Sequence, residues 1–300
     1  MITVTAPTGT IGAQVVDLLL DRGRQVRVVV RNPARLTPRV RDNVDIVEGS
    51  HSDADVIAAA FDGADTLFWL VPPDPRAPSV EAAYVDFAKP ACAALPASGI
   101  QRVVGVSALG RGTPMADRAG YVTASLATDN LIASTGVAYR ALTMPSFMDN
   151  LVRQAELISN RGVFFSPIAG DRAMPSCASC DIASTAVTLL TDASWNGVAD
   201  VPVLGPADLS FDDMAAVMSQ VLGRPVRYQQ IEGPAFKETM LGHGMSDAMA
   251  QGMLDMAMAK NAGLDNVEPR TPENSTPTTF RQWCIDVLKP AVARIEENRP

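Results

Sequence analysis

The sequence predicts an α/β fold, in which a doubly wound parallel sheet is joined to a smaller α/β lobe. Through about the first 145 residues, short runs rich in Val, Ile and Leu alternate with stretches of helical periodicity, a pattern typical of strands connected by crossover helices. After residue 150 the sequence is richer in proline and methionine, and its helical patterns are broken. The change predicts two domains, residues 1–150 and residues 151–300, with later segments returning to the first.

The predicted elements of the first half follow one another as strand and helix. An apolar strand that ends at Thr5 leads into a helix from residue 11, whose apolar residues recur at helical spacing until Arg22 and Gly23 end it. Further strands are expected at residues 25–30, 44–48, 65–70, 102–107 and 138–142, and helices at 54–61, 80–97 and 117–134. Ligands of such sheets bind at the carboxyl ends of the strands, where we expect the functional residues.

The loop between the first strand and the first helix has the spacing of a dinucleotide-binding turn. In that turn, small residues let the backbone approach a pyrophosphate, and the N–H groups of the following helix face the anion. Gly9 and Gly12 are present, but Ala6 stands where the first glycine usually makes the turn, and Pro7 removes one backbone donor. With the strand and helix that follow, this loop predicts a Rossmann-type nucleotide site.

The residues after the second strand favour NADP(H) over NAD(H). An acidic residue there would bind the ribose 2′-hydroxyl of NAD, whereas this chain has Arg31 and Arg35 and no acid between them. A guanidinium is well suited to pair with a 2′-phosphate. The alternative interpretation is that both arginines are solvated charges in a loop and at a helix start.

Composition and charge exclude several classes of partner. With 300 residues, 47% of them hydrophobic, the chain can bury a large core. The net charge is −8, and the sequence contains no cluster of cationic residues that could bind along a nucleic acid or an anionic membrane. Because no apolar run is long enough to cross a bilayer and no signal-peptide pattern is present, we expect a cytoplasmic protein.

The cysteines and histidines do not form a metal-binding pattern. Cys177 and Cys180 have suggestive spacing, but a second pair of ligands is missing, and the two histidines, His51 and His243, are far apart in sequence. We therefore expect reduced thiols and no bound metal.

The second half is expected to form a substrate lobe. Strands are predicted at residues 201–204 and 226–228, on either side of a helix at 211–222 that Gly223 ends. A methionine face then follows on one helix and comprises Met245, Met249, Met253 and Met256. These side chains are interpreted either as adaptable core residues or as a soft cover over an apolar substrate.

Four stretches of the chain resemble the NmrA-like family, atypical members of the short-chain dehydrogenase/reductase superfamily: residues 5–12, 106–110, 133–151, and 181–183 followed by 204–210. The resemblance implies an NADP(H)-binding domain with a smaller C-terminal lobe. Members reduce quinones, enones or phenolic ethers, or bind the cofactor as sensors. The matching cofactor-contact positions are Thr8, Gly9, Thr10, Ile11, Arg31, Val71, Pro72, Ser107, Pro145 and Phe147.

The usual catalytic set of the superfamily is incomplete in this chain. Conventional members use a serine, a tyrosine that protonates the substrate oxygen, and a lysine that lowers the tyrosine pKa. Here Ser107 ends the fifth strand and Tyr121 begins the next helix, but the residue four positions later is Ser125, and this helix contains no lysine. The predicted catalytic residues are Ser107, Tyr121 and His243. The alternatives are a pocket-rim aromatic for Tyr121 and a loop histidine without a catalytic role for His243.

Without a tyrosine–lysine pair, a reaction must rely on an acceptor that is already electrophilic. We expect an NADPH-dependent reductase of an apolar quinone, conjugated enone or polyketide-like substrate, in which the protein orients the reactants and excludes water. The alternative is a catalytically silent NADP(H)-binding redox sensor. The expected partner is a small apolar molecule, with no direct binding of nucleic acid or membrane, and a homodimer is left open.

Overall fold

The computed structural model describes residues 1–297, and the contacts within it divide the chain into two compact units. Unit 1 consists of Met1–Ala108, Val122–Thr143 and Ile182–Val201. Unit 2 consists of Leu109–Tyr121, Met144–Asp181 and the chain from Pro202 onward. Each unit is therefore built from segments that are far apart in the sequence.

Unit 1 contains a seven-stranded sheet in the order β10-β6-β5-β4-β1-β2-β3. The five strands from β3 to β5 pair in parallel, with Ile2 of β1 beside Val26 of β2 and Thr66 of β4. This arrangement confirms the predicted Rossmann-type doubly wound fold. The strands are β1 (Ile2–Thr5), β2 (Val26–Val30), β3 (Asp45–Glu48), β4 (Thr66–Trp69), β5 (Arg102–Ala108), β6 (Ala138–Met144) and β10 (Val198–Pro202).

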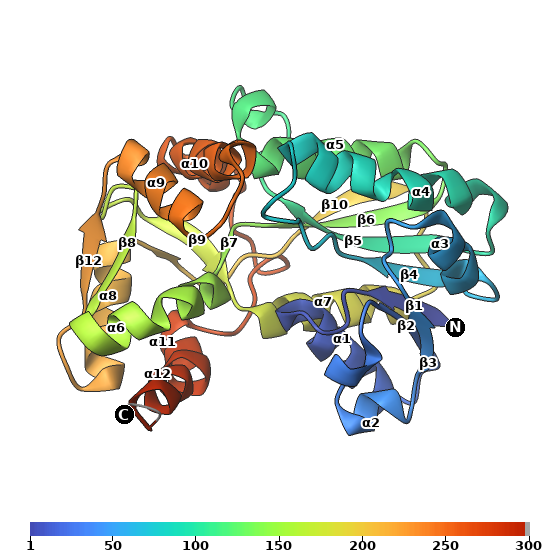
Figure 1. Ribbon diagram of the computed structural model, residues 1–300, viewed down its shortest axis with the longest axis horizontal. Coiled ribbons are helices and arrows are strands. Elements are labelled where there is room, and N and C mark those ends of the chain that lie inside the picture. Colours follow the sequence, from blue (N-terminus) through green and yellow to red (C-terminus); the bar gives the residue numbers. More distant parts are fainter. Residues whose placement is uncertain (298–300) are drawn as a thin grey trace. The chain divides into compact units, whose positions relative to one another are not determined.

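Helices cover both faces of this sheet. Figure 1 shows α4 (Phe87–Ala94) and α5 (Tyr121–Ala133) on one face, and α1 (Thr10–Asp21) and α7 (Ser179–Thr191) on the other. Because both faces are covered, β1 and β4 are buried along their whole length, and Val4, Phe68 and Leu142 are fully buried. The remaining helical segments are η1 (Pro33–Arg35), α2 (Pro38–Arg41), α3 (Ala54–Phe61), η2 (Ala82–Asp86) and η3 (Leu95–Ala97).

One strand predicted for the substrate lobe belongs to unit 1. The strand expected at residues 201–204 is β10, at Val198–Pro202, and it extends the sheet beside β6. The Tyr139 N–H donates a 2.9 Å hydrogen bond to the Gly197 carbonyl where these segments meet. The predicted strand overlaps β10 only at residues 201–202, and residues 202–204 belong to unit 2. The sequence pattern therefore places the strand too late in the chain and does not indicate that it joins the unit 1 sheet.

Unit 2 contains two smaller sheets. One has the order β11-β9-β7, and in the other β8 and β12 pair in parallel. The strands are β7 (Ser146–Phe147), β8 (Val163–Ser166), β9 (Met174–Cys177), β11 (Asp208–Leu209) and β12 (Arg227–Gln230). The helical segments are η4 (Ala116–Arg118), η5 (Met148–Gln154), α6 (Ala155–Arg161), α8 (Phe211–Leu222), α9 (Gly233–Gly242), α10 (Asp247–Asn261), η6 (Leu264–Val267), α11 (Phe280–Trp283), η7 (Cys284–Leu288) and α12 (Lys289–Glu297).

Helix α8 forms at the residues the sequence predicts. Ser210 and Asp213 make a capping box at its start, and Gly223 ends it in the left-handed conformation. On the methionine face, Met249 of α10 is fully buried, as a core residue would be. Met253 and Met256 lie on the same helix and are half-buried, whereas Met245 precedes the helix, so its predicted place on the helix is wrong. A covering role for the half-buried methionines stays a prediction.

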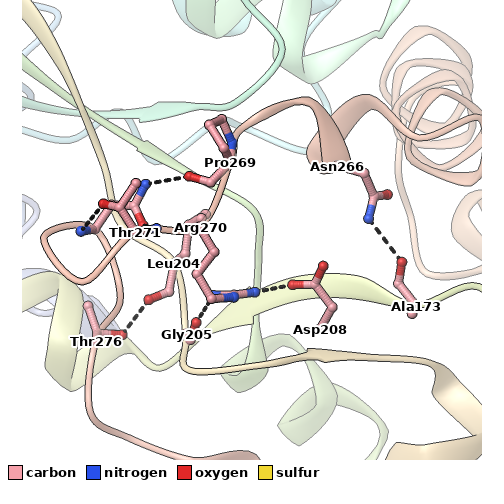
Figure 2. Close-up of polar contacts among 10 residues, drawn as sticks. Ala173, Leu204, Gly205, Asp208, Asn266, Pro269, Arg270, Thr271 and Thr276 are labelled. Atoms are coloured by element: carbon pink, nitrogen blue, oxygen red, sulfur yellow. Dashed lines mark hydrogen bonds and ion pairs between the residues drawn. The ribbon is translucent and has the colours of Figure 1, made fainter.

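Residues 262–279 form a long connecting segment of unit 2 whose one short helix is η6, and polar contacts hold it against the rest of that unit (Figure 2). The Arg270 guanidinium donates to the Gly205 carbonyl and pairs with Asp208. Asn266 Nδ2 donates to the Ala173 carbonyl at 3.0 Å, and Thr276 Oγ1 donates to the Leu204 carbonyl at 2.9 Å. These bonds use backbone groups that flank β9 and β11, so they fix the course of the segment.

A buried ion pair stands at the start of this segment. Lys260 Nζ lies 2.5 Å from Asp265 Oδ2, and the two side chains are 6% and 1% exposed. The other carboxylate oxygen, Oδ1, is buried and has no hydrogen-bond partner among the described residues. Lys260 is therefore the cation that compensates for burial of the Asp265 side chain. No helix within residues 1–297 combines the length and apolar character needed to span a bilayer.

Candidate functional site

The predicted cofactor residues of unit 1 lie along one edge of its sheet. Residues 8–11 follow β1, Arg31 directly follows β2, and residues 71–72 follow β4, while Ser107 is the penultimate residue of β5. Because β2, β1, β4 and β5 are adjacent and parallel, their carboxyl ends share this edge. The structure thus brings these residues together, whereas Pro145 and Phe147 belong to unit 2.

The turn after β1 is tight and leaves no room for a side chain at Gly12. Among residues 1–297, Ala6 is the one non-glycine residue with a positive φ, of 51°, a conformation that glycine adopts more readily. The Gly9 N–H donates a 3.1 Å hydrogen bond to the Ala6 carbonyl. A Cβ on Gly12 would lie 2.2 Å from the same carbonyl oxygen, so the turn requires glycine there.

Helix α1 begins directly from this turn. Gly9 is its N-cap and provides no side-chain cap, and the first turn contains no acidic residue. The backbone N–H groups of a first helical turn have no acceptor within the helix, and together with the helix dipole they favour an anion. The N-terminus of α1, which has no side-chain cap, fits the pyrophosphate of a dinucleotide, and Gly12 lets the helix pack closely against the turn.

His51 is buried close to this edge, although the sequence gives it no role. Its Nε2 lies 3.0 Å from the Leu70 carbonyl, and because a carbonyl only accepts, Nε2 carries the hydrogen. The ring packs edge-on against Trp69 and Phe87, at centroid distances of 5.2 and 4.7 Å. Burial lowers the pKa of His51 to about 4, against the opposing effect of the Leu70 hydrogen bond, and the charge of Arg31 lowers it further. Neutral His51 therefore braces the segment between β4 and Val71.

Acidification is expected to destabilise the protein through His51. In the unfolded chain this histidine binds a proton near pH 6.5, whereas in the folded chain it binds one only near pH 4. Its contribution is present above pH 6.5 and lost as the pH falls, which lowers the free energy of unfolding by about 3 kcal/mol at pH 4. Urea denaturation of the wild type and His51→Gln between pH 7 and pH 4 measures the difference. A pH dependence in His51→Gln equal to that of the wild type would contradict the assignment.

Ser107 takes part in a buried hydrogen-bond network. Its hydroxyl donates to Asp129 Oδ2, and the Tyr139 hydroxyl donates to Asp129 Oδ1 at 2.6 Å. The Ser125 hydroxyl lies 3.5 Å from that of Ser107. Asp129 and Tyr139 are functional candidates that the sequence pattern misses. The available signal is that Asp129 follows Ser125 by four residues, which places both on one face of α5.

The other two predicted catalytic residues belong to unit 2. Tyr121, the first residue of α5, is buried, and burial raises its pKa to about 12 although the charge of Arg153 opposes the shift. Tyr121 is therefore a weaker acid than a free phenol. His243 is exposed and ends α9, where its backbone N–H donates to the carbonyls of Thr239 and Met240. Catalytic roles for both stay predictions.

A surface cavity of about 350 Å³ lies at the opposite edge of the unit 1 sheet. It is lined by residues at the starts of β1, β4 and β5, among them Ile2, Thr66 and Arg102. None of the predicted cofactor residues lines it. Within residues 1–297, no three His, Cys, Asp or Glu side chains are grouped so that they could hold a metal ion.

Comparison with known proteins shows the family to which the chain belongs. Residues 7–193 match the family described as NAD(P)H-binding. The chain is 30% identical over 256 residues to the NAD(P)H azoreductase of Xenophilus azovorans, covering 85% of this chain and 86% of the relative. It is 29% identical over 292 residues to (4-alkanoyl-5-oxo-2,5-dihydrofuran-3-yl)methyl phosphate reductase of Streptomyces griseus, covering 95% and 97% of the two chains.

A solved structure shares the whole fold. The NADPH-dependent quinone oxidoreductase from Escherichia coli superimposes with a TM-score of 0.75 at 20% identity, covering 99% of this chain and 100% of the other. The resemblance to NmrA-like, atypical short-chain dehydrogenase/reductase proteins is confirmed, as is a nicotinamide dinucleotide cofactor. The matched family model spans more than half of the sequence and begins in the turn that Ala6 and Gly12 form, so the chain belongs to the NAD(P)H-binding family.

Proposed function

We propose that this protein is an NADPH-dependent reductase of small conjugated acceptors. The observation that carries the proposal is the edge of the unit 1 sheet, where the Gly12 turn and the bare start of α1 stand beside Arg31. Arg31 is exposed directly after β2, and no acidic residue follows within residues 31–35 to bind a 2′-hydroxyl. This supports a 2′-phosphate, and hence NADPH rather than NADH.

Each group of residues at this edge would contact a different part of the cofactor. The N–H groups of Thr10 and Ile11 face the pyrophosphate, and the Arg31 guanidinium pairs with the 2′-phosphate. Val71 and Pro72 supply an apolar wall after β4, braced by His51 through Leu70. When bound, NADPH supplies the hydride, while the protein orients the reactants and excludes water.

The substrate class follows from what the relatives share and from what this chain lacks. The names of the relatives describe an azo compound, a quinone and an acyl-dihydrofuranone, all conjugated electrophiles. Position 125 holds serine in place of a lysine, and the pKa of Tyr121 is about 12, so the chain offers no strong acid there. This combination suits acceptors that take up hydride without prior protonation.

Oxidation of NADPH, monitored at 340 nm with a panel of quinones, azo compounds and enones, tests the proposal. We expect turnover with at least one acceptor class and higher kcat/KM with NADPH than with NADH. Calorimetric binding of NADPH without turnover of any acceptor would contradict the reductase and favour a redox sensor. Absence of binding would contradict both functions.

Replacement of Arg31 by alanine is expected to change cofactor preference. Loss of a charged hydrogen bond to the 2′-phosphate should weaken NADPH binding about 10- to 100-fold and leave NADH binding within about twofold. Fluorescence titration with both cofactors measures the two dissociation constants. Arg24→Ala, at the exposed opposite edge of the sheet, is the matched control. An equal loss for both cofactors in Arg31→Ala would exclude a specific phosphate contact.

A further inference from the structure

The Ser107 hydroxyl is held by a buried acidic side chain that nucleotide binding by itself does not require. Asp129, on α5, is 3% exposed, and Ser107, on β5, is 5% exposed. The carboxylate accepts hydrogen from Ser107 through Oδ2 and from the Tyr139 hydroxyl through Oδ1. Such charge-assisted bonds compensate for burying a carboxylate. We call Ser107, Asp129 and Tyr139 the Asp129 cluster.

Packing leaves the Asp129 cluster little freedom to rearrange. Tyr139 is 1% exposed, and its ring lies over Gly105, where an added Cβ would be 2.2 Å from the phenol oxygen. The glycine therefore makes the space that the phenol occupies, two residues before Ser107 on the same strand. With the phenol fixed, the plane of the Asp129 carboxylate is fixed, and with it the direction of the Ser107 hydrogen.

The direction of that hydrogen determines what Ser107 can bind. A serine hydroxyl has one hydrogen and two lone pairs. Because the hydrogen points to Asp129, the oxygen meets any other partner as an acceptor. In the 3.5 Å contact with Ser125, at the limit of hydrogen bonding, Ser125 is accordingly the donor. Ser107 cannot polarise a substrate carbonyl while Asp129 holds its hydrogen.

We propose that Asp129 and Tyr139 are positioning residues that hold Ser107 as a hydrogen-bond acceptor toward the donors of a bound nicotinamide riboside, its sugar hydroxyls and carboxamide N–H. This inference rests on the proposed function and deepens it. Ser107 orients the cofactor and does not activate the acceptor. The site is then suited to substrates that need no hydrogen bond to a carbonyl oxygen.

A double-mutant cycle tests the inference with NADPH as the ligand. Calorimetry is carried out on the wild type, Asp129→Asn, Ser107→Ala and the double variant, with the exposed Asp62→Asn as the matched control. Each single variant at the cluster should weaken NADPH binding about tenfold. The double variant should bind no more weakly than Ser107→Ala. Additive losses, about 100-fold in the double variant, or unchanged binding in Asp129→Asn would overturn the inference.

A second measurement separates positioning from a merely structural role. In Asp129→Asn the Ser107 hydrogen is no longer held by a charged acceptor, so it becomes available to a substrate carbonyl. The ratio of kcat/KM for an enone to that for an azo compound should rise at least about threefold. A loss of both activities by the same factor would indicate structural damage and contradict the inference.

Two further comparisons keep the outcome decisive. If Asp129→Asn does not fold, Tyr139→Phe replaces it, because this variant removes one of the hydroxyl groups that donate to the Asp129 carboxylate. Tyr139→Phe should weaken NADPH binding about threefold when Ser107 is present and have no effect on binding in the Ser107→Ala background. An equal effect in both backgrounds would overturn the inference. Failure of the wild type to bind NADPH or to reduce any acceptor contradicts the proposed function, whereas an additive cycle in an active enzyme contradicts only the role of Asp129.

Discussion

Gly12→Ala is expected to weaken NADPH binding at least about 100-fold and to lower the free energy of unfolding by about 2–4 kcal/mol. The added methyl group would lie 2.2 Å from the Ala6 carbonyl oxygen, a backbone atom that a side-chain rotation cannot move away. Either the turn opens or α1 shifts, and both displace the N–H groups that face the pyrophosphate. Calorimetry with NADPH and urea denaturation measure the two effects.

The same turn offers two matched controls. At Gly9, where φ is −85° and a Cβ would lie 3.4 Å from the Ala6 carbonyl, alanine should change the free energy of unfolding by less than about 1 kcal/mol. Ala6→Gly relieves the positive φ and should stabilise the fold by about 0.5–1 kcal/mol while binding is kept. If Gly12→Ala and Gly9→Ala had the same free energy of unfolding, the close approach of Gly12 to the Ala6 carbonyl would be contradicted.

Lys260→Met is expected to lower the free energy of unfolding by about 3–5 kcal/mol near neutral pH. The substitution removes the cation that pairs with the Asp265 side chain, which is 1% exposed and whose Oδ1 has no hydrogen-bond partner among the described residues. Removing one partner of a buried ion pair destabilises a protein by more than the intact pair stabilises it, because the remaining group stays buried without compensation. Urea denaturation at pH 7 measures the loss.

Removing both charges should recover most of that loss. In the double variant Lys260→Met, Asp265→Leu, no charge remains buried, so stability should return to within about 2 kcal/mol of the wild type. Lys237→Met is the matched control, because its partner Asp247 is 76% exposed and such pairs contribute less than about 1 kcal/mol. Equal losses in Lys260→Met and Lys237→Met would contradict the dependence of Asp265 on Lys260.

The sequence predicts the frame of unit 1 well, for physical reasons. The strands that end before Ala6, Arg31 and Val71 are apolar runs between helical patterns, and local periodicity is sufficient to place them. β10 is misplaced because it joins the sheet only after residues of unit 2 have intervened, and its pairing with β6 depends on contacts that are not local.

The candidate site is predicted only in part. Gly12 and Arg31 are found from spacing, because their functions depend on a turn and on the end of a strand. His51 and Asp129 are not found, because their roles arise from packing: His51 is surrounded by Trp69 and Phe87, and Asp129 meets a tyrosine from another strand. The local sequence around a single histidine or aspartate does not predict whether its side chain is buried.

The late position of β10 has a consequence for biosynthesis. The edge strand next to β6 lies at residues 198–202, so the ribosome has made two thirds of the chain before the sheet that contains the nucleotide turn can be completed. Until then β6 presents an unpaired strand edge, the kind of surface that associates with other chains. The sheet of unit 1 is therefore incomplete until β10 has been synthesised.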